Sequence, residues 1–154
     1  MWMYVKFSLV FFVIHFVCYN VAGAIDFQLA KKMYSGKDRL YKSFFRDMDD
    51  QEESKRIVKL LIPSQFLRAT LMSVVLYPVL PYLMELSFVL QFIFMGGLMF
   101  VYADFGSAIP FSNTIEGIVY LKKEFVAKKV FWTIQFEAIL YSILFGLLSA
   151  VFLI

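Results

Sequence analysis

The stretch from Ala69 to Ala103 constrains the fold of this chain more than any other part of its sequence. Glu85 is the only residue in it that normally carries a charge at neutral pH. A single helix of this length would measure about 50 Å, whereas the hydrocarbon core of a bilayer is about 30 Å thick. We therefore expect a helical hairpin, with its break at Pro78 and Pro81 near the middle of the stretch.

Composition extends this conclusion to the whole chain. Of its 154 residues, 61% are hydrophobic, and the mean hydropathy is +0.73. Backbone in lipid must satisfy its own hydrogen bonds, which leaves helices or a closed barrel. The long apolar runs lack the two-residue alternation of strands. The sequence thus predicts an all-α integral membrane protein, a single domain over residues 1–154, with spans at about 4–24, 65–83, 88–108 and 130–154.

The first span contains only Lys6 and His15 as ionisable groups. Its single basic residue, apolar centre and small residues at 22–24 also fit a secretory signal with a cleavage site. The apolar run is longer than the core of a usual signal, so we expect a retained transmembrane helix.

Two polar segments, 25–64 and 110–129, connect the spans. In the first, five apolar side chains recur at the three- and four-residue spacing of one helical face: Leu40, Tyr41, Phe44, Phe45 and Met48. Asp50 with Glu53 predicts the start of a second amphipathic helix, which Pro63 ends, and Ser64 then caps the second span. We expect both short helices at the membrane interface, either on lipid headgroups or as a cap on the bundle.

The basic residues predict the orientation. In a four-span chain both polar segments lie on one side, and with Arg68 they hold all 15 Lys and Arg residues except Lys6. The positive-inside rule then places both segments in the cytoplasm and both termini outside. An inner or plasma membrane is the default assignment for such a chain.

Ionisable groups inside spans are costly and are therefore candidate functional residues. Glu137 is the only charged residue of the last span and could bind a proton or cation, or lock helices together through hydrogen bonds. His15 falls at a similar depth, so a His15–Glu137 contact is one alternative and a bond from His15 to a backbone carbonyl is the other. Asp104 and Arg68 end the hairpin on the same side, where they could form an ion pair or an ion or headgroup site.

Small residues on the last two spans predict close helix packing. The last span carries them at unbroken four-residue spacing: Ala138, Ser142, Gly146 and Ala150. Gly96 and Gly97 are candidates for a comparable contact on the third span. The stripe either joins these two helices within one chain or faces outward to another subunit.

The sequence lacks the motifs of several classes of functional site. Cys18 is the only cysteine and His15 the only histidine, which excludes an internal disulfide and a bis-histidine haem site in this chain. We find no zinc-ligand spacing, nucleotide-binding loop or nucleic-acid motif, and predict no cofactor, no metal and no nucleic-acid partner.

These observations favour a non-catalytic accessory or scaffold subunit of a larger membrane complex, whose partners are the lipid bilayer and other membrane subunits or a second copy of the chain. The alternative is a small transporter or channel that uses Glu137 and, because four helices enclose little space, works as at least a dimer. A membrane-embedded enzyme acting on a lipid or quinone comes third, since Asp104, Arg68 and Glu116 match no catalytic set.

Overall fold

The computed structural model describes residues 1–153, and within this range the chain is helical without strands. Four helical segments are long and apolar enough to cross a membrane: α1 (Trp2–Tyr34), α2 (Gln51–Val75), Phe88–Phe105 and α6 (Lys128–Phe152). The third combines α4 (Phe88–Phe100) with the π-helical turn η2 (Val101–Phe105). The prediction of an all-helical chain with four helices long and apolar enough to cross a membrane is thus confirmed.

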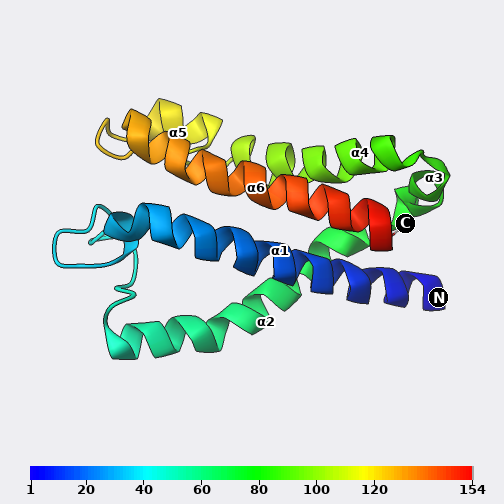
Figure 1. Ribbon diagram of the computed structural model, residues 1–154, viewed down its shortest axis with the longest axis horizontal. Helices are drawn as coiled ribbons and strands as arrows, with labels where there is room; N and C mark the ends of the chain where they lie inside the picture. The colour runs from blue at the N-terminus through cyan, green and yellow to red at the C-terminus, as the bar shows by residue number, and fades with distance from the viewer. Residues whose placement is uncertain (154) are drawn as a thin grey trace.

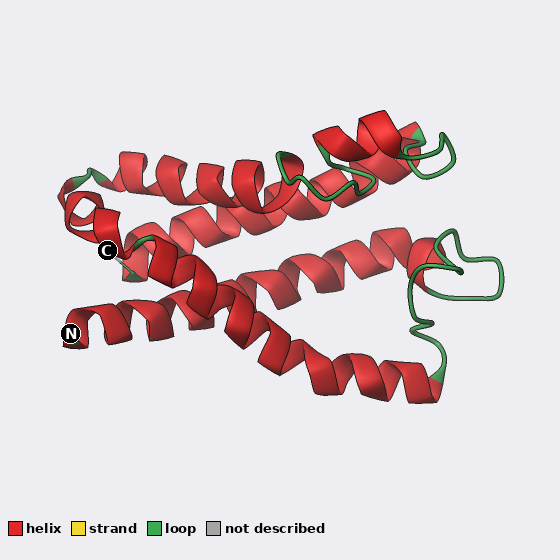
Figure 2. Cartoon of the chain, turned by 180° about the vertical axis from the view of Figure 1, so that it is seen from behind, coloured by secondary structure: helices red, strands yellow, loops and turns green. Residues whose placement is uncertain are grey.

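The helices form an antiparallel bundle with two distinct ends (Figure 1). Both termini and the short helix α3 (Leu80–Glu85) lie at one end, which we call the terminal end. The two polar connections, with α5 (Ile115–Tyr120), lie at the other, which we call the loop end. α6 packs against both α1 and α4, and α2 packs against α1. Figures 1 and 2 both show α2 crossing α1 and diverging from it toward the loop end.

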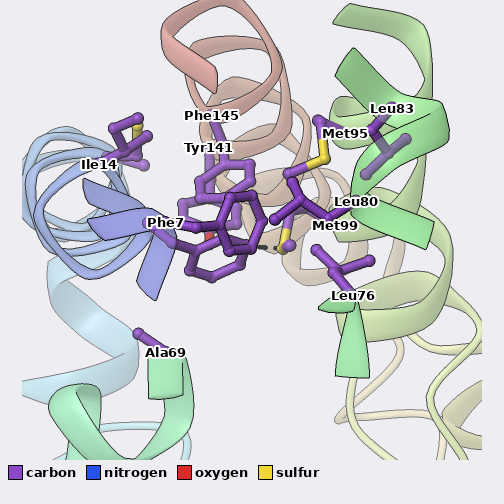
Figure 3. Packing of buried hydrophobic residues seen from close by; sticks show 13 residues of the cluster. Phe7, Ile14, Ala69, Leu76, Leu80, Leu83, Met95, Met99, Tyr141 and Phe145 are labelled. Carbon is purple, nitrogen blue, oxygen red and sulfur yellow. Dashed lines mark hydrogen bonds between the residues drawn. The ribbon is translucent and has the colours of Figure 1, made fainter. Parts of the chain in front are cut away.

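An apolar core fills the terminal half of the bundle. Phe7, Phe11 and Phe145 meet there with Met95 and other side chains from every long helix. The rings of Phe11 and Phe145 lie 5.0 Å apart edge to face, which is a favoured aromatic arrangement. Figure 3 shows Phe7 and Phe145 in the space between the helices, facing α4 with its Met95 and Met99. This core closes the bundle toward the terminal end.

The hairpin break lies at the two prolines, as predicted. α2 ends at Val75, the 3₁₀ turn η1 (Tyr77–Val79) contains Pro78, and α3 begins at Leu80 with Pro81 in its first turn. Proline lacks an N–H, and the first turn of a helix has no use for one. The second span therefore stops well before the predicted residue 83.

The predicted break at Pro63 is wrong. α2 starts at Gln51 and continues through Pro63, so the second amphipathic helix and the second span are one helix, and Ser64 is not a cap. Its start is as expected, because the Asp50 side chain accepts hydrogen bonds from the backbone N–H groups of Glu52 and Glu53. A continuous helix leaves fewer backbone groups without partners in lipid than a break does.

The predicted amphipathic helix over 40–48 is also absent, and the segment forms turns instead. Gly36 begins it with a φ of +96°, a conformation that favours glycine. Arg39 and Asp47 pair at 2.7 Å and hold the turns together. The apolar rings that suggested a helix pack across the two loops, where Tyr41 stacks on Phe111 and Phe125.

Candidate functional site

A polar cavity of about 310 Å³ lies near the loop end of the bundle. Its walls come from α1, α4 with η2, α6 and both loops, and Arg68 reaches it from α2. Eight of its lining residues carry polar or ionisable side chains: Tyr19, Asp26, Tyr34, Arg68, Asp104, Asn113, Glu137 and Tyr141. Three of these are acidic and one is basic, so the cavity has an excess of carboxyl groups.

α1 presents one face to this cavity. Tyr19, Gly23 and Asp26 follow each other at four- and three-residue spacing, which places them on the same side of a helix. α1 continues to Tyr34, ten residues beyond the predicted end of the first span, with a kink at Ala30. Asp26 therefore lies within the helix and not in a solvated loop, which is why sequence reasoning missed it.

Asp26 is the most deeply buried acid of the site. Its side chain is 2% exposed, and its Oδ1 atom has no hydrogen-bond partner. A buried carboxylate oxygen without a donor is costly, because it has lost water and gained nothing. The cavity next to Asp26 is the place where a bound molecule could supply that donor.

Glu137 reaches the cavity from α6, opposite Gly23. A Cβ atom at Gly23 would lie 3.4 Å from Glu137 Oε1, which is an ordinary contact distance and shows that the carboxyl group faces α1 at this position. The carboxyl groups of Asp26 and Glu137 lie within hydrogen-bonding reach of each other, and the charge of Asp104 also acts on Glu137. The structure thus brings Glu137 together with two other acids.

Asp104 lies in η2 and is held from the second loop. Its Oδ1 accepts a hydrogen bond of 2.5 Å from Asn113 Nδ2. π-Helical turns occur frequently at functional sites. The expected ion pair with Arg68 is not formed within residues 1–153, although both side chains line the cavity. Asn113 was not predicted, since nothing local distinguishes it from other polar loop residues.

The loop that carries Asn113 is fixed by its own sequence. Thr114 caps α5 by accepting a hydrogen bond of 2.9 Å from Gly117 N–H. A Cβ atom at Gly117 would lie 1.6 Å from Phe111 O, so only glycine permits this close approach. The Tyr41 hydroxyl hydrogen-bonds Ser112 and ties the first loop to the second. Burial of Tyr41 raises the pKa of its phenol above the usual value, because the anion would lose its hydration.

His15 lies behind the cavity wall and does not meet Glu137. Its Nδ1 is 2.5 Å from the Tyr141 hydroxyl, and its Nε2 is 2.9 Å from Gln65 Oε1. An amide oxygen only accepts, so Nε2 donates to Gln65 and Nδ1 accepts from Tyr141, as in a neutral imidazole. His15 therefore bonds to two side chains and not to a backbone carbonyl, and these bonds join α1 to α2 and α6.

A second polar contact between α1 and α2 lies toward the terminal end. Ser8 Oγ is 2.7 Å from Ser73 Oγ and 2.6 Å from the Tyr77 hydroxyl. Phe11 and Ala69, both buried, lie between this contact and His15 along the two helices. The polar contacts of Ser8 and His15 consequently join the helices but form no continuous polar path.

The small-residue stripe of α6 is buried inside the chain, on the α4 side. Its members Ala138, Ser142, Gly146 and Ala150 are all buried. A Cβ atom at Gly96 would lie 2.9 Å from Ser142 O, and one at Gly146 would lie 2.7 Å from Phe92 O. Gly97 is exposed, with nothing within 4 Å of its Cβ position. The stripe therefore joins α4 and α6 and is not left free for a partner.

The site offers hydrogen-bond acceptors and aromatic walls rather than a nucleophile. Cys18 is fully buried and does not line the cavity, and both ring nitrogens of His15 are engaged. Within residues 1–153, no group of three His, Cys, Asp or Glu side chains is arranged to hold a metal ion. The arrangement is suited to binding a polar or positively charged molecule.

Comparison with known proteins adds no relative to this geometry: no family model, no curated protein and no solved structure matches the chain.

Proposed function

We propose that this protein is a small membrane transporter that binds a polar solute in the cavity formed by Asp26, Asp104 and Glu137. The observation that carries the proposal is the meeting of three carboxyl groups in one cavity of a helical membrane bundle. Acidic side chains at such positions are costly, and in membrane proteins they mark substrate and ion pathways.

The shape of the bundle supports access from one side. The cavity reaches the surface beside Met48 and Arg68, which are both exposed. Toward the terminal end the apolar core around Phe11 and Phe145 closes the bundle. Such an arrangement fits one state of an alternating-access cycle, in which movement of this core would open the other side. With four helices per chain, we propose that a dimer carries out the cycle.

The basic residues support an assignment of sides. The loop end carries every Lys and Arg residue except Lys6 and Arg68, which lies within α2. The positive-inside rule therefore supports a cytoplasmic loop end. We propose that the cavity opens to the cytoplasm of an inner or plasma membrane and that both termini lie outside.

Electrical recording from proteoliposomes tests this function. The reconstituted protein is exposed to a panel of cationic, neutral and anionic metabolites while charge movement is recorded on a supported membrane. We expect a saturable current for at least one solute, lost in Glu137→Gln and retained in Glu85→Gln, whose carboxyl group is exposed at the terminal end. Currents that are absent for the whole panel, or equal in the two variants, would contradict transport through this cavity.

A second candidate function is that of an accessory subunit. The first half of α2, residues 51–64, contributes no buried residue, and its apolar side chains Val58, Leu60 and Ile62 are exposed. A partner helix could cover this surface, as lipid could. Stoichiometric co-purification of another membrane protein, lost when Val58 and Ile62 are replaced by Ser, would favour this candidate.

A further inference from the structure

We infer that the molecule bound in the cavity is a small organic cation whose ammonium group lies against Asp26 and Glu137. This inference rests on the proposed solute-binding function and adds the chemical class of the solute. Four properties of the cavity support it: the balance of charge, an unsatisfied acceptor, the aromatic walls and the size.

The balance of charge favours a cation. Asp26, Asp104 and Glu137 line the cavity with Arg68 as the only basic side chain among its lining residues. Arg68 is exposed and makes no ion pair within the described part of the chain, whereas Asp26 is buried. A cation bound beside the buried Asp26 would reduce the repulsion among the three acids.

Asp26 Oδ1 gives the cation a specific place to bind. This atom is buried in a side chain that is only 2% exposed, and the neighbouring Glu137 carboxyl group can donate to Asp26 only when it is protonated. Asp104 already accepts from Asn113. An ammonium N–H directed at Oδ1 would form a charge-assisted hydrogen bond, which is among the stronger polar contacts in proteins.

Aromatic rings make the walls suitable for an organic cation. Tyr19, Tyr34 and Tyr141 line the cavity with Phe27 and Phe111. The faces of such rings attract ammonium groups, most strongly where water is excluded. These ring faces do not attract an anion. The tyrosine hydroxyl groups could hydrogen-bond a polar tail on the solute.

The size of the cavity and the arrangement of its acids favour a small organic solute over a bare metal ion. About 310 Å³ lies at the lower limit of the roughly 300–1,000 Å³ of small-molecule sites. Within residues 1–153 the acids do not converge as metal ligands. A solute with a methylated or primary ammonium head and a short tail matches these dimensions.

Equilibrium binding to the purified full-length protein in detergent tests the inference. The probes are choline, tetramethylammonium and methylammonium, with 3,3-dimethylbutanol as the uncharged isostere of choline and sodium chloride as the inorganic control. We expect methylammonium, the one ammonium probe whose N–H groups can donate to Asp26 Oδ1, to bind in calorimetry. We also expect choline, which offers a charge to the aromatic walls but no N–H, to bind at least about tenfold more tightly than its isostere.

Variants assign the binding to the cavity. Asp26→Asn keeps the shape and removes the charge, so we expect ammonium binding to weaken by about 10- to 100-fold. Arg68→Gln removes the lining cation and should tighten binding, while Glu85→Gln should leave it unchanged. If Asp26→Asn fails to give a monodisperse protein on gel filtration, Glu137→Gln serves as the charge-removing variant.

The outcomes separate this inference from the proposed function. Binding of the isostere or of sodium as tight as that of every ammonium probe would overturn the inference, as would binding unaffected by both acid-to-amide variants. A Glu137-dependent current for a neutral or anionic solute, without ammonium binding, would overturn the inference and leave transport standing. Ammonium binding without any current would support the inference and overturn transport.

Discussion

Gly96 and Gly97 are neighbours in α4 with opposite surroundings, which makes them a matched pair for testing how the bundle is held together. A Cβ atom at Gly96 would lie 2.9 Å from Ser142 O on α6, whereas one at Gly97 would meet nothing within 4 Å. Replacement of either glycine by alanine brings the same gain in helix propensity, about 1 kcal/mol. Any difference in stability between the two variants therefore reports the α4–α6 contact.

The geometry sets the size of the expected difference. Ordinary carbon–oxygen contacts begin near 3.4 Å, so α4 must move away from α6 by about 0.5 Å in Gly96→Ala. Such overpacking typically costs about 1–3 kcal/mol. We expect Gly97→Ala to be as stable as the parent or up to about 1 kcal/mol more stable, and Gly96→Ala to be less stable than Gly97→Ala by about 1–3 kcal/mol.

Reversible unfolding by SDS in lipid–detergent micelles measures these values, with the fluorescence of Trp2 and Trp132 as the signal. Gly146→Ala provides a check from the other helix, because its Cβ atom would lie 2.7 Å from Phe92 O. Equal stability of Gly96→Ala and Gly97→Ala would refute the close packing of α4 on α6. A larger loss in Gly97→Ala would indicate that the opposite face of α4 makes the tight contact, for example with a second copy of the chain.

Three further predictions concern the loops and the wall of the cavity. Tyr41→Phe removes the hydrogen bond to Ser112 and should cost about 0.5–1.5 kcal/mol of unfolding free energy at neutral pH. Burial raises the pKa of Tyr41, so the folded chain holds the phenol proton more tightly than the unfolded chain does. The parent should therefore lose stability as the pH rises past about 10, and Tyr41→Phe should lose less. A parallel decline in both proteins would contradict this. Asp50→Ala removes the cap of α2 and should cost about 1 kcal/mol and increase hydrogen exchange in its first turn, whereas unchanged exchange would argue against the cap. Tyr141→Phe leaves His15 Nδ1 buried without its donor and should cost about 1–3 kcal/mol in the same unfolding assay, and a neutral effect would argue against this bond.

The sequence predicted the number of spans and the hairpin break because these depend on local properties. Apolar length sets the spans, and the prolines at 78 and 81 set the break. Asp50 was found as a cap for the same reason, since its bonds reach only two and three residues along the chain.

The errors arose where contacts between distant residues decide the local structure. The segment 40–48 has helical periodicity, yet its rings pack on Phe111 and Phe125 in the second loop. Pro63 was interpreted as a helix break, whereas α2 continues through it from Gln51 to Val75. Neither effect can be read from a short window of sequence.

The candidate site was predicted in part. Glu137, Asp104 and Arg68 were found because charged residues in apolar runs are conspicuous, and all three line the cavity. Asp26 was missed because the predicted span ended at residue 24. The partners of His15 are 50 and 126 residues away, so no local pattern could indicate them.

The proposed function requires that the cavity beside Asp26 and Glu137 opens only toward the loop end. Cysteine accessibility tests it directly in a Cys18→Ala background, with Gly23→Cys in the cavity wall, Phe11→Cys in the closed core and Ser43→Cys as a marker of the loop side. We expect a membrane-impermeant trimethylammonium thiosulfonate to modify the cysteine at position 23 from the side that modifies position 43, and to leave position 11 unmodified from both sides. Modification of position 23 only from the opposite side, or from neither side, would contradict it.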